Sequence, residues 1–89
     1  MTISKKDLCI IHGITLDKNS SRKLRKKIFT DQVLELMGMP LEQYNKIQIF
    51  DRYYSVLIIK LLYLSENELA KVNIQFDPSH IHQEQKSNS

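Results

Sequence analysis

The sequence predicts an all-α fold: a small bundle of four to five short helices with a possible short β wing and a disordered C-terminal tail. Three observations lead to this prediction. Apolar residues recur at helical spacing, hydroxyl and acidic residues stand where helices would begin, and the two Gly and two Pro fall between predicted elements or in the tail. A chain of 89 residues forms one small domain. We expect a single compact helical domain over residues 1–77, followed by a tail over 78–89.

The first predicted helix runs from Lys5 to about His12. Ser4 can cap it and Asp7 stands three residues later, which is the spacing of a capping box. Gly13 follows where helices commonly end in the left-handed conformation.

A second helix is predicted over residues 21–29, after a polar loop. Ser20 or Ser21 can serve as its cap, and Leu24 and Ile28 form its apolar stripe. The advance of about 100° per residue then sends Arg22 and the later basic residues away from the core.

Further helices are predicted in the remaining chain. Thr30 caps a helix over 31–37, another begins near Pro40, and a last short helix follows the capping box that starts at Ser65. The stretches 47–50 and 72–76 are the candidates for a β wing.

Residues 53–64 form the most apolar segment, with ten apolar residues among twelve. We predict a central core helix, while a helix shared across a dimer interface and a buried strand over 56–59 stay open as alternatives. Twelve residues interrupted by a lysine are too short to span a bilayer, which needs about 20, so no membrane partner is expected. The side chains expected at a possible homodimer interface are Tyr53, Tyr54, Leu57 and Leu61.

The basic residues are concentrated at the amino-terminal end. Residues 1–30 hold eight basic and two acidic side chains, a net charge of +6, whereas residues 31–89 hold five basic and eight acidic ones, a net charge of −3. Such an asymmetry is typical of a chain whose one end faces a polyanion. No acid occurs within residues 20–29.

A basic helix that follows another capped helix is the arrangement of a helix-turn-helix. In that motif the start of the second helix reaches base edges in the major groove, and the surrounding cations hold phosphates. The residues expected to contact bases are Arg22, Lys23 and Lys26. Those expected to contact phosphates are Lys5, Lys6, Lys18, Arg25 and Lys27. The alternative is an ordinary solvated helix face.

The segments 4–14 and 20–28 together resemble the opening of the excisionase-like and MerR-like winged helix-turn-helix proteins. This chain and that family both have a first helix with lysine, an acid and leucine before glycine and isoleucine. In both, a serine, an arginine and a leucine then follow at the start of the second helix. The resemblance covers about 25 residues. It implies a helix-turn-helix-like amino-terminal half and binding to double-stranded DNA, in transcription regulation or in directing recombination on mobile elements.

An enzyme is not expected, because paired carboxylates at catalytic spacing and glycine-rich phosphate loops are missing from the sequence. One Cys and three His have no recurring ligand spacing, so we expect no metal and no cofactor, and His80 and His82 are read as part of the tail. A single Cys cannot form an internal disulfide, which favours a reduced, cytoplasmic chain.

Two other functions stay open. The chain can be a protein-interaction module, such as a small phage or plasmid accessory protein, that uses the apolar helix over 53–64 and has no nucleic-acid role. Basic charge alone does not separate binding of DNA from binding of RNA.

Overall fold

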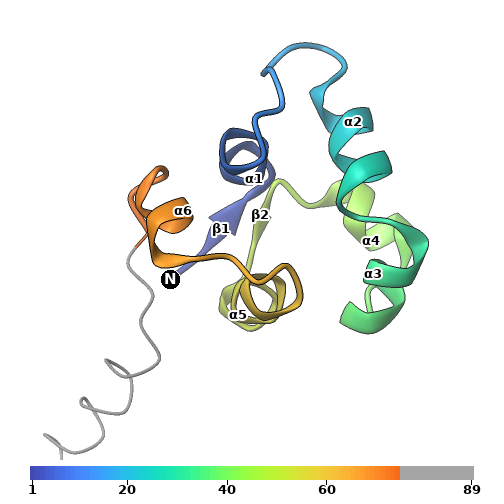
Figure 1. Ribbon diagram of the computed structural model, residues 1–89. Coiled ribbons are helices and arrows are strands. Elements are labelled where there is room, and N and C mark those ends of the chain that lie inside the picture. The colour runs from blue at the N-terminus through green and yellow to red at the C-terminus, as the bar shows by residue number, and fades with distance from the viewer. Residues whose placement is uncertain (75–89) are drawn as a thin grey trace, which may run out of the picture.

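Six helices and one two-stranded antiparallel sheet make up residues 1–74, the part of the chain that this computed structural model describes (Figure 1). The elements, in chain order, are β1 (Ile3–Ser4), α1 (Lys5–Ile11), α2 (Ser20–Lys27), α3 (Asp31–Met37), α4 (Leu41–Lys46), β2 (Ile49–Phe50), α5 (Arg52–Leu61) and α6 (Glu66–Ala70). The prediction of a mostly helical chain is confirmed. The predicted count of four to five helices is too low, because all six segments with helical signals, including the short α6 behind its predicted cap, form separate helices.

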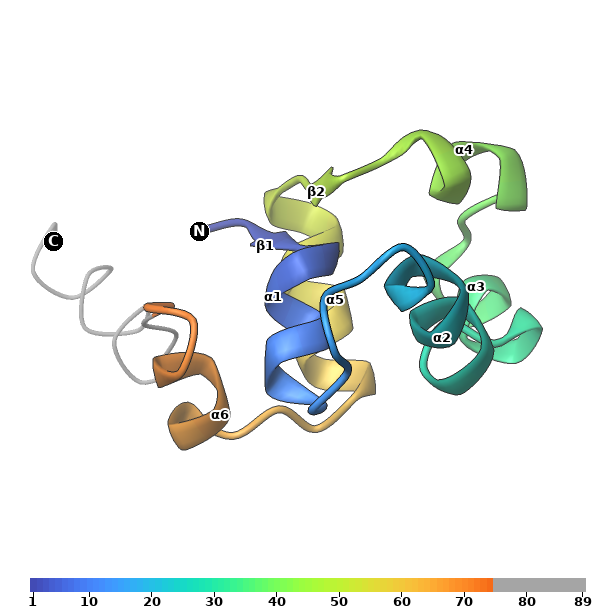
Figure 2. The same ribbon diagram turned by 90° about the horizontal axis from the view of Figure 1, so that it is seen from above.

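The sheet lies between α1 and α5, and α2, α3 and α4 stand together on one side of it (Figure 1). Seen from above, α1 lies over α5, and α6 stands at the opposite side from α2 to α4 (Figure 2). Helix α1 packs against α2, and α3 packs against α5. The pairing of β1 with β2 and the contact between α3 and α5 join segments that are farther apart in the sequence.

Local caps determine where three of the helices begin. Ser4 and Asp7 form the predicted capping box of α1, and Ser65 and Glu68 form that of α6. Thr30 caps α3 by accepting a hydrogen bond from the Val33 amide. These three helix starts confirm the sequence-based predictions.

The start of α2 differs from its prediction. Asn19 is the N-cap residue and its side chain makes no capping bond, while the Ser20 hydroxyl donates a hydrogen bond to the Asp17 carbonyl at 2.8 Å. Ser20 therefore belongs to the helix, and the serine cap predicted for this helix is wrong.

Residues 53–61 of the apolar segment 53–64 belong to α5. The strand alternative over 56–59 is therefore excluded. The helix begins one residue earlier than predicted because the Asp51 carboxylate accepts a hydrogen bond from the Tyr54 amide. It ends at Leu61, three residues before the predicted end.

The two wing candidates behave differently. Ile49 and Phe50 form β2, but β2 pairs with the strand that precedes α1 and is not a hairpin wing. Val72 and Asn73 lie in a turn in which Asn73 has a positive φ of 60°, so no strand begins there. The end of that candidate, at 75–76, and the predicted tail over 78–89 lie outside the described residues.

Three aromatic rings form the centre of the core. The Phe29 ring lies 5.0 Å from that of Tyr44 and 5.5 Å from that of Phe50, between ring centroids. All three side chains are almost fully buried. Because Phe29 lies two residues after the end of α2, this cluster fixes the basic helix to the rest of the molecule.

Within residues 1–74, no helix is long and apolar enough to cross a bilayer.

Candidate nucleic-acid interface

Helix α2 turns one apolar residue into the core and its cations outward. Leu24 is fully buried, and Phe29 holds the end of the helix in the aromatic cluster. The exposed cations of the helix, called the α2 basic face below, are Arg22, Lys23, Lys26 and Lys27. The predicted orientation of the basic residues around Leu24 is confirmed for these four side chains.

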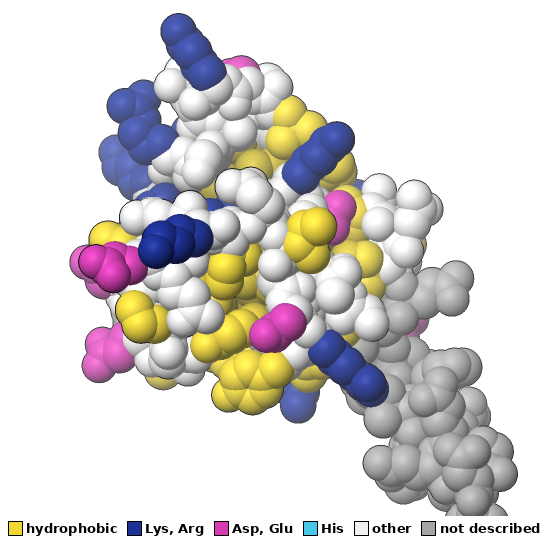
Figure 3. Space-filling model, turned by 180° about the vertical axis from the view of Figure 1, so that it is seen from behind, with side chains coloured by type: hydrophobic (Ala, Val, Ile, Leu, Met, Phe, Trp, Pro, Cys, Tyr) yellow, Lys and Arg dark blue, Asp and Glu magenta, His cyan; other side chains and the backbone are white. Residues whose placement is uncertain are grey.

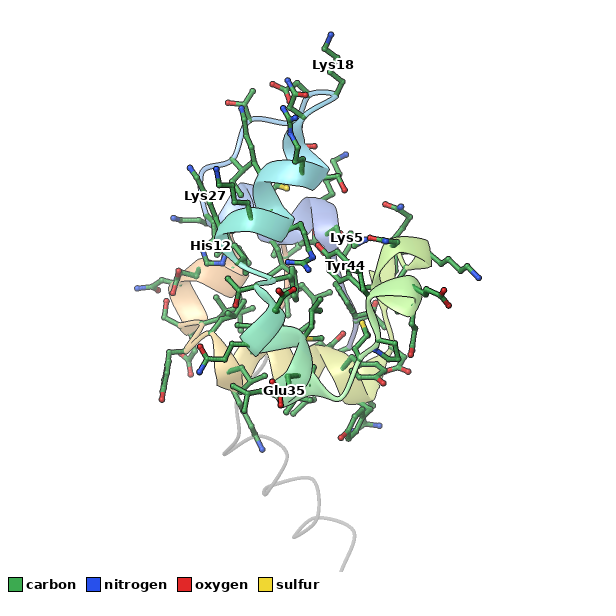
Figure 4. The ribbon with its side chains drawn as sticks, turned by 90° about the vertical axis from the view of Figure 1, so that its right-hand side faces the viewer. Lys5, His12, Lys18, Lys27, Glu35 and Tyr44 are labelled. Carbon is green, nitrogen blue, oxygen red and sulfur yellow. The ribbon has the colours of Figure 1, made fainter. Side chains whose placement is uncertain are left out.

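Two further cations stand on neighbouring elements. Lys18 points away from the core at the tip of the loop before α2, and Lys27 points outward from the other end of the helix (Figure 4). Lys6 is exposed on α1, which packs against α2. Seen from behind, basic side chains gather at the end of the molecule that carries α2 and its loop (Figure 3).

Acidic side chains do not neutralise this surface. Across residues 1–74 the structure contains a single ion pair, between Arg25 and Asp31. The α2 basic face, Lys6 and Lys18 therefore have no ion pair in this part of the chain, and they outnumber the neighbouring Asp7 and Asp17, which favours a local potential that attracts anions.

Arg25 differs from the other α2 cations because its guanidinium is hydrogen-bonded within the protein. Its Nη2 donates to the Asp31 carboxylate at 2.6 Å and its Nη1 donates to the Phe29 carbonyl at 2.8 Å. The guanidinium thus joins the end of α2 to the start of α3. The phosphate contact predicted for Arg25 would require this pair to open.

Lys5 lies inside the molecule, where the sequence suggested a surface cation beside Lys6. Its side chain is only 7% exposed, its Nζ donates to the Tyr44 carbonyl at 2.7 Å, and the ammonium stands 3.8 Å from the centre of the Tyr44 ring (Figure 4). Burial lowers the pKa of Lys5. The surface position expected for Lys5 is wrong, because α4 covers this side chain.

A hollow of about 340 Å³ lies between α1 and the start of α2. Its wall includes Lys6, Ser20, Ser21 and Gln48. The first amides of a helix favour an anion, and the Asn19 side chain does not occupy them. Sequence reasoning treated the two serines only as caps and did not identify Gln48, which reaches this place from the segment before β2.

The four residues expected at a homodimer interface all lie on α5 but have different surroundings. Tyr53 is 68% exposed, whereas Tyr54, Leu57 and Leu61 are half-buried and pack against the core. The prediction of a central core helix is thus correct for only one side of α5.

No family model matches the chain, and comparisons with curated proteins and with solved structures likewise found no match. Among the described side chains, no group of three or more His, Cys, Asp or Glu is placed to hold a metal ion. His80 and His82 lie outside that part of the chain.

Replacing Tyr44 with phenylalanine is expected to raise the free energy of unfolding by about 1 kcal/mol at neutral pH. The Tyr44 hydroxyl is buried and has no hydrogen-bond partner among residues 1–74, so its removal relieves a desolvation cost. Urea unfolding curves of the two proteins measure the difference. Tyr63→Phe is the matched control, because Tyr63 is 90% exposed and its change should leave stability unaltered. A loss of stability in Tyr44→Phe would show that the hydroxyl is in fact paired.

The free energies of unfolding of the unchanged protein and of Tyr44→Phe are expected to differ increasingly at alkaline pH. Burial raises the pKa of Tyr44 to about 12, and the nearby Arg25 opposes this shift. A raised folded-state pKa gives stability that is present below about pH 10 and is lost as the pH rises towards 12. Tyr44→Phe should lack this loss, which urea unfolding at a series of alkaline pH values measures.

Proposed function

We propose that this protein binds double-stranded DNA through the α2 basic face, as a small helix-turn-helix type protein of transcription regulation or nucleoprotein assembly in the cytoplasm. The observation that carries the proposal is the set of exposed, unpaired cations on one helix without any acid. It is supported by Lys6 and Lys18 on the flanking elements, and by the resemblance of segments 4–14 and 20–28 to excisionase-like and MerR-like proteins.

The geometry suggests how the contacts divide. Arg22, Lys23 and Lys26 extend from the exposed side of α2, and in the major groove they would meet base edges such as the O6 and N7 atoms of guanine. Lys6, Lys18 and Lys27 stand around them and would hold phosphates. Ser20 and Ser21, at the amino end of α2, would receive a phosphate beside Lys6.

Eight residues, His12 to Asn19, connect α1 to α2, more than the three or four of a standard helix-turn-helix turn. The connection carries Lys18 outward at its tip (Figure 4). In this proposal the longer loop provides a phosphate contact ahead of the recognition helix.

Fluorescence anisotropy with a labelled mixed-sequence DNA duplex tests this function. Binding should be strong at about 50 mM salt and fall steeply towards about 200 mM, because each neutralised phosphate adds about 0.9 to the logarithmic slope. The double variant Arg22→Ala with Lys26→Ala should bind about tenfold or more weakly, since two cations of the contact surface are lost.

The matched control is Lys46→Ala with Lys71→Ala, which removes the same charge from exposed positions outside the α2 basic face. It should bind DNA almost as the unchanged protein does. Equal weakening by both double variants, or no binding at low salt, would refute the proposal. A duplex RNA of the same sequence, used as competitor, separates DNA binding from RNA binding.

A further inference from the structure

The outward side of α5 carries a shallow apolar depression, called the α5 groove below, that the DNA proposal does not use. It has a volume of about 540 Å³, and all of its lining residues belong to α5: Arg52, Tyr53, Val56, Leu57 and Lys60. Their spacing places them on one side of the helix. Ser55, Ile58 and Ile59, on the opposite side, are buried in the core. Helix α5 is therefore apolar on two sides, and only one side is needed to hold the fold together.

Tyr53 is placed as an anchor in this groove. Its side chain is 68% exposed, and its ring packs against that of Tyr54 at 5.1 Å in an edge-to-face arrangement. Tyr54 in turn packs against the core. A ring oriented in this way loses little conformational freedom when a partner covers it, and aromatic residues of this kind dominate binding energy at protein interfaces.

The charges of the groove select the kind of partner. Arg52 and Lys60 stand at its two ends, eight residues or about 12 Å apart along the helix axis. Helix α5 contains no acidic residue, and neither cation has an ion pair within the described structure. A complementary partner needs apolar residues in its middle and carboxylates about two helical turns apart.

A second copy of the chain fits this pattern poorly. Two α5 faces related by a twofold axis would bring Arg52 next to Lys60 of the other copy if antiparallel, and like residues together if parallel. Like charges are then adjacent in both arrangements. Nucleic acid is also a poor occupant, because Tyr53, Val56 and Leu57 offer no hydrogen-bond donor along the middle of the groove except the Tyr53 hydroxyl.

We propose that the α5 groove binds an acidic amphipathic helix of a partner protein. In this mode the apolar side of the partner helix lies over Tyr53, Val56 and Leu57, while its carboxylates pair with Arg52 and Lys60. The binding surface is separate from the α2 basic face and does not depend on DNA binding. The protein would then connect a nucleic acid to an acidic protein.

Two designed peptides test this proposal by fluorescence anisotropy with the full-length protein. Both have about 15 residues, enough for partial helix formation, and leucines at helical spacing. One carries glutamates at the two positions that would face Arg52 and Lys60, and the other carries lysines there. The glutamate peptide should bind at least tenfold more tightly. The double variant Arg52→Glu with Lys60→Glu should reverse the preference, which a general loss of folding would not do.

Three further variants locate the binding. Tyr53→Ala should weaken binding of the glutamate peptide about tenfold or more, whereas Tyr63→Ala removes a more exposed ring outside the groove and should not. Arg22→Ala with Lys26→Ala should lose DNA binding and keep peptide binding. Failure of the DNA proposal can therefore be distinguished from failure of the peptide proposal.

The proposal is overturned if both peptides bind equally or neither binds. It is also overturned if the α2 double variant loses the glutamate peptide, because the acids would then be held by the α2 basic face. Sedimentation that shows a concentration-dependent dimer, lost in Tyr53→Ala, would assign the groove to a second copy instead.

Discussion

Replacing Phe29 with alanine is expected to lower the free energy of unfolding by about 3–5 kcal/mol. The side chain is fully buried, and its ring packs against those of Tyr44 and Phe50. The substitution would remove these contacts and leave a cavity at the point where α2 joins the core. Urea unfolding at equilibrium measures the change. Because small domains are stabilised by only about 5–15 kcal/mol, this is the largest effect that we expect from one substitution.

Two controls separate the aromatic cluster from a general effect of side-chain truncation. Leu36→Ala removes an apolar side chain that is 60% exposed, so it should cost well under 1 kcal/mol. Phe29→Leu keeps an apolar side chain at the position and should cost less than Phe29→Ala. If Phe29→Ala were no more damaging than Leu36→Ala, the cluster would not be the attachment point of α2.

Replacing Ser55 with alanine is expected to lower the free energy of unfolding by about 2–4 kcal/mol. The Ser55 hydroxyl is fully buried and makes two hydrogen bonds: it accepts from the Ile3 amide at 2.9 Å and donates to the Phe50 carbonyl at 3.1 Å. Its removal would deprive two buried backbone groups of a partner, one in each strand.

Hydrogen exchange gives a local readout for this variant. The Ile3 amide should exchange faster in Ser55→Ala than the global loss of stability alone explains, because its acceptor is gone. Ser21→Ala, at an exposed position, should change stability by less than about 0.5 kcal/mol. If the Ile3 amide kept its protection in Ser55→Ala, the hydroxyl would not be what holds the sheet on α5.

Short-range signals explain what could be predicted of the fold. The side chains of Ser4, Thr30 and Ser65 each accept a hydrogen bond from the amide three residues later. The capping residue and its partner therefore lie within four consecutive residues of the sequence. Gly38 likewise ends α3 in the left-handed conformation, with φ at 68°. The bounds of α3 were therefore predicted to the residue. At α2 the prediction failed because the Ser20 hydroxyl bonds backward to the Asp17 carbonyl.

The candidate site was predictable to the extent that it depends on helical periodicity. Once Leu24 is placed inward, the exposure of Arg22, Lys23 and Lys26 follows from the advance of about 100° per residue. Lys5 fell outside that reasoning, because its acceptor is the carbonyl of Tyr44, 39 residues later in the chain. Helical spacing does separate the two lysines, because Lys5 lies three and four residues before the buried Leu8 and Cys9, whereas Lys6 is turned outward. The sequence does not show which group accepts the Lys5 hydrogen bond.

The sequence by itself therefore determined the positions of most helices and the sign of the charge on each part of the chain, because both depend on residues within a few positions of one another. Only the tertiary structure decided that Lys5 is buried and that Arg25 is ion-paired, which strand pairs with β2, and which side of α5 remains uncovered. Those outcomes depend on segments that meet after tens of residues. Ser55 is an example: in the sequence it interrupts an apolar run, and in the fold it joins two strands to a helix.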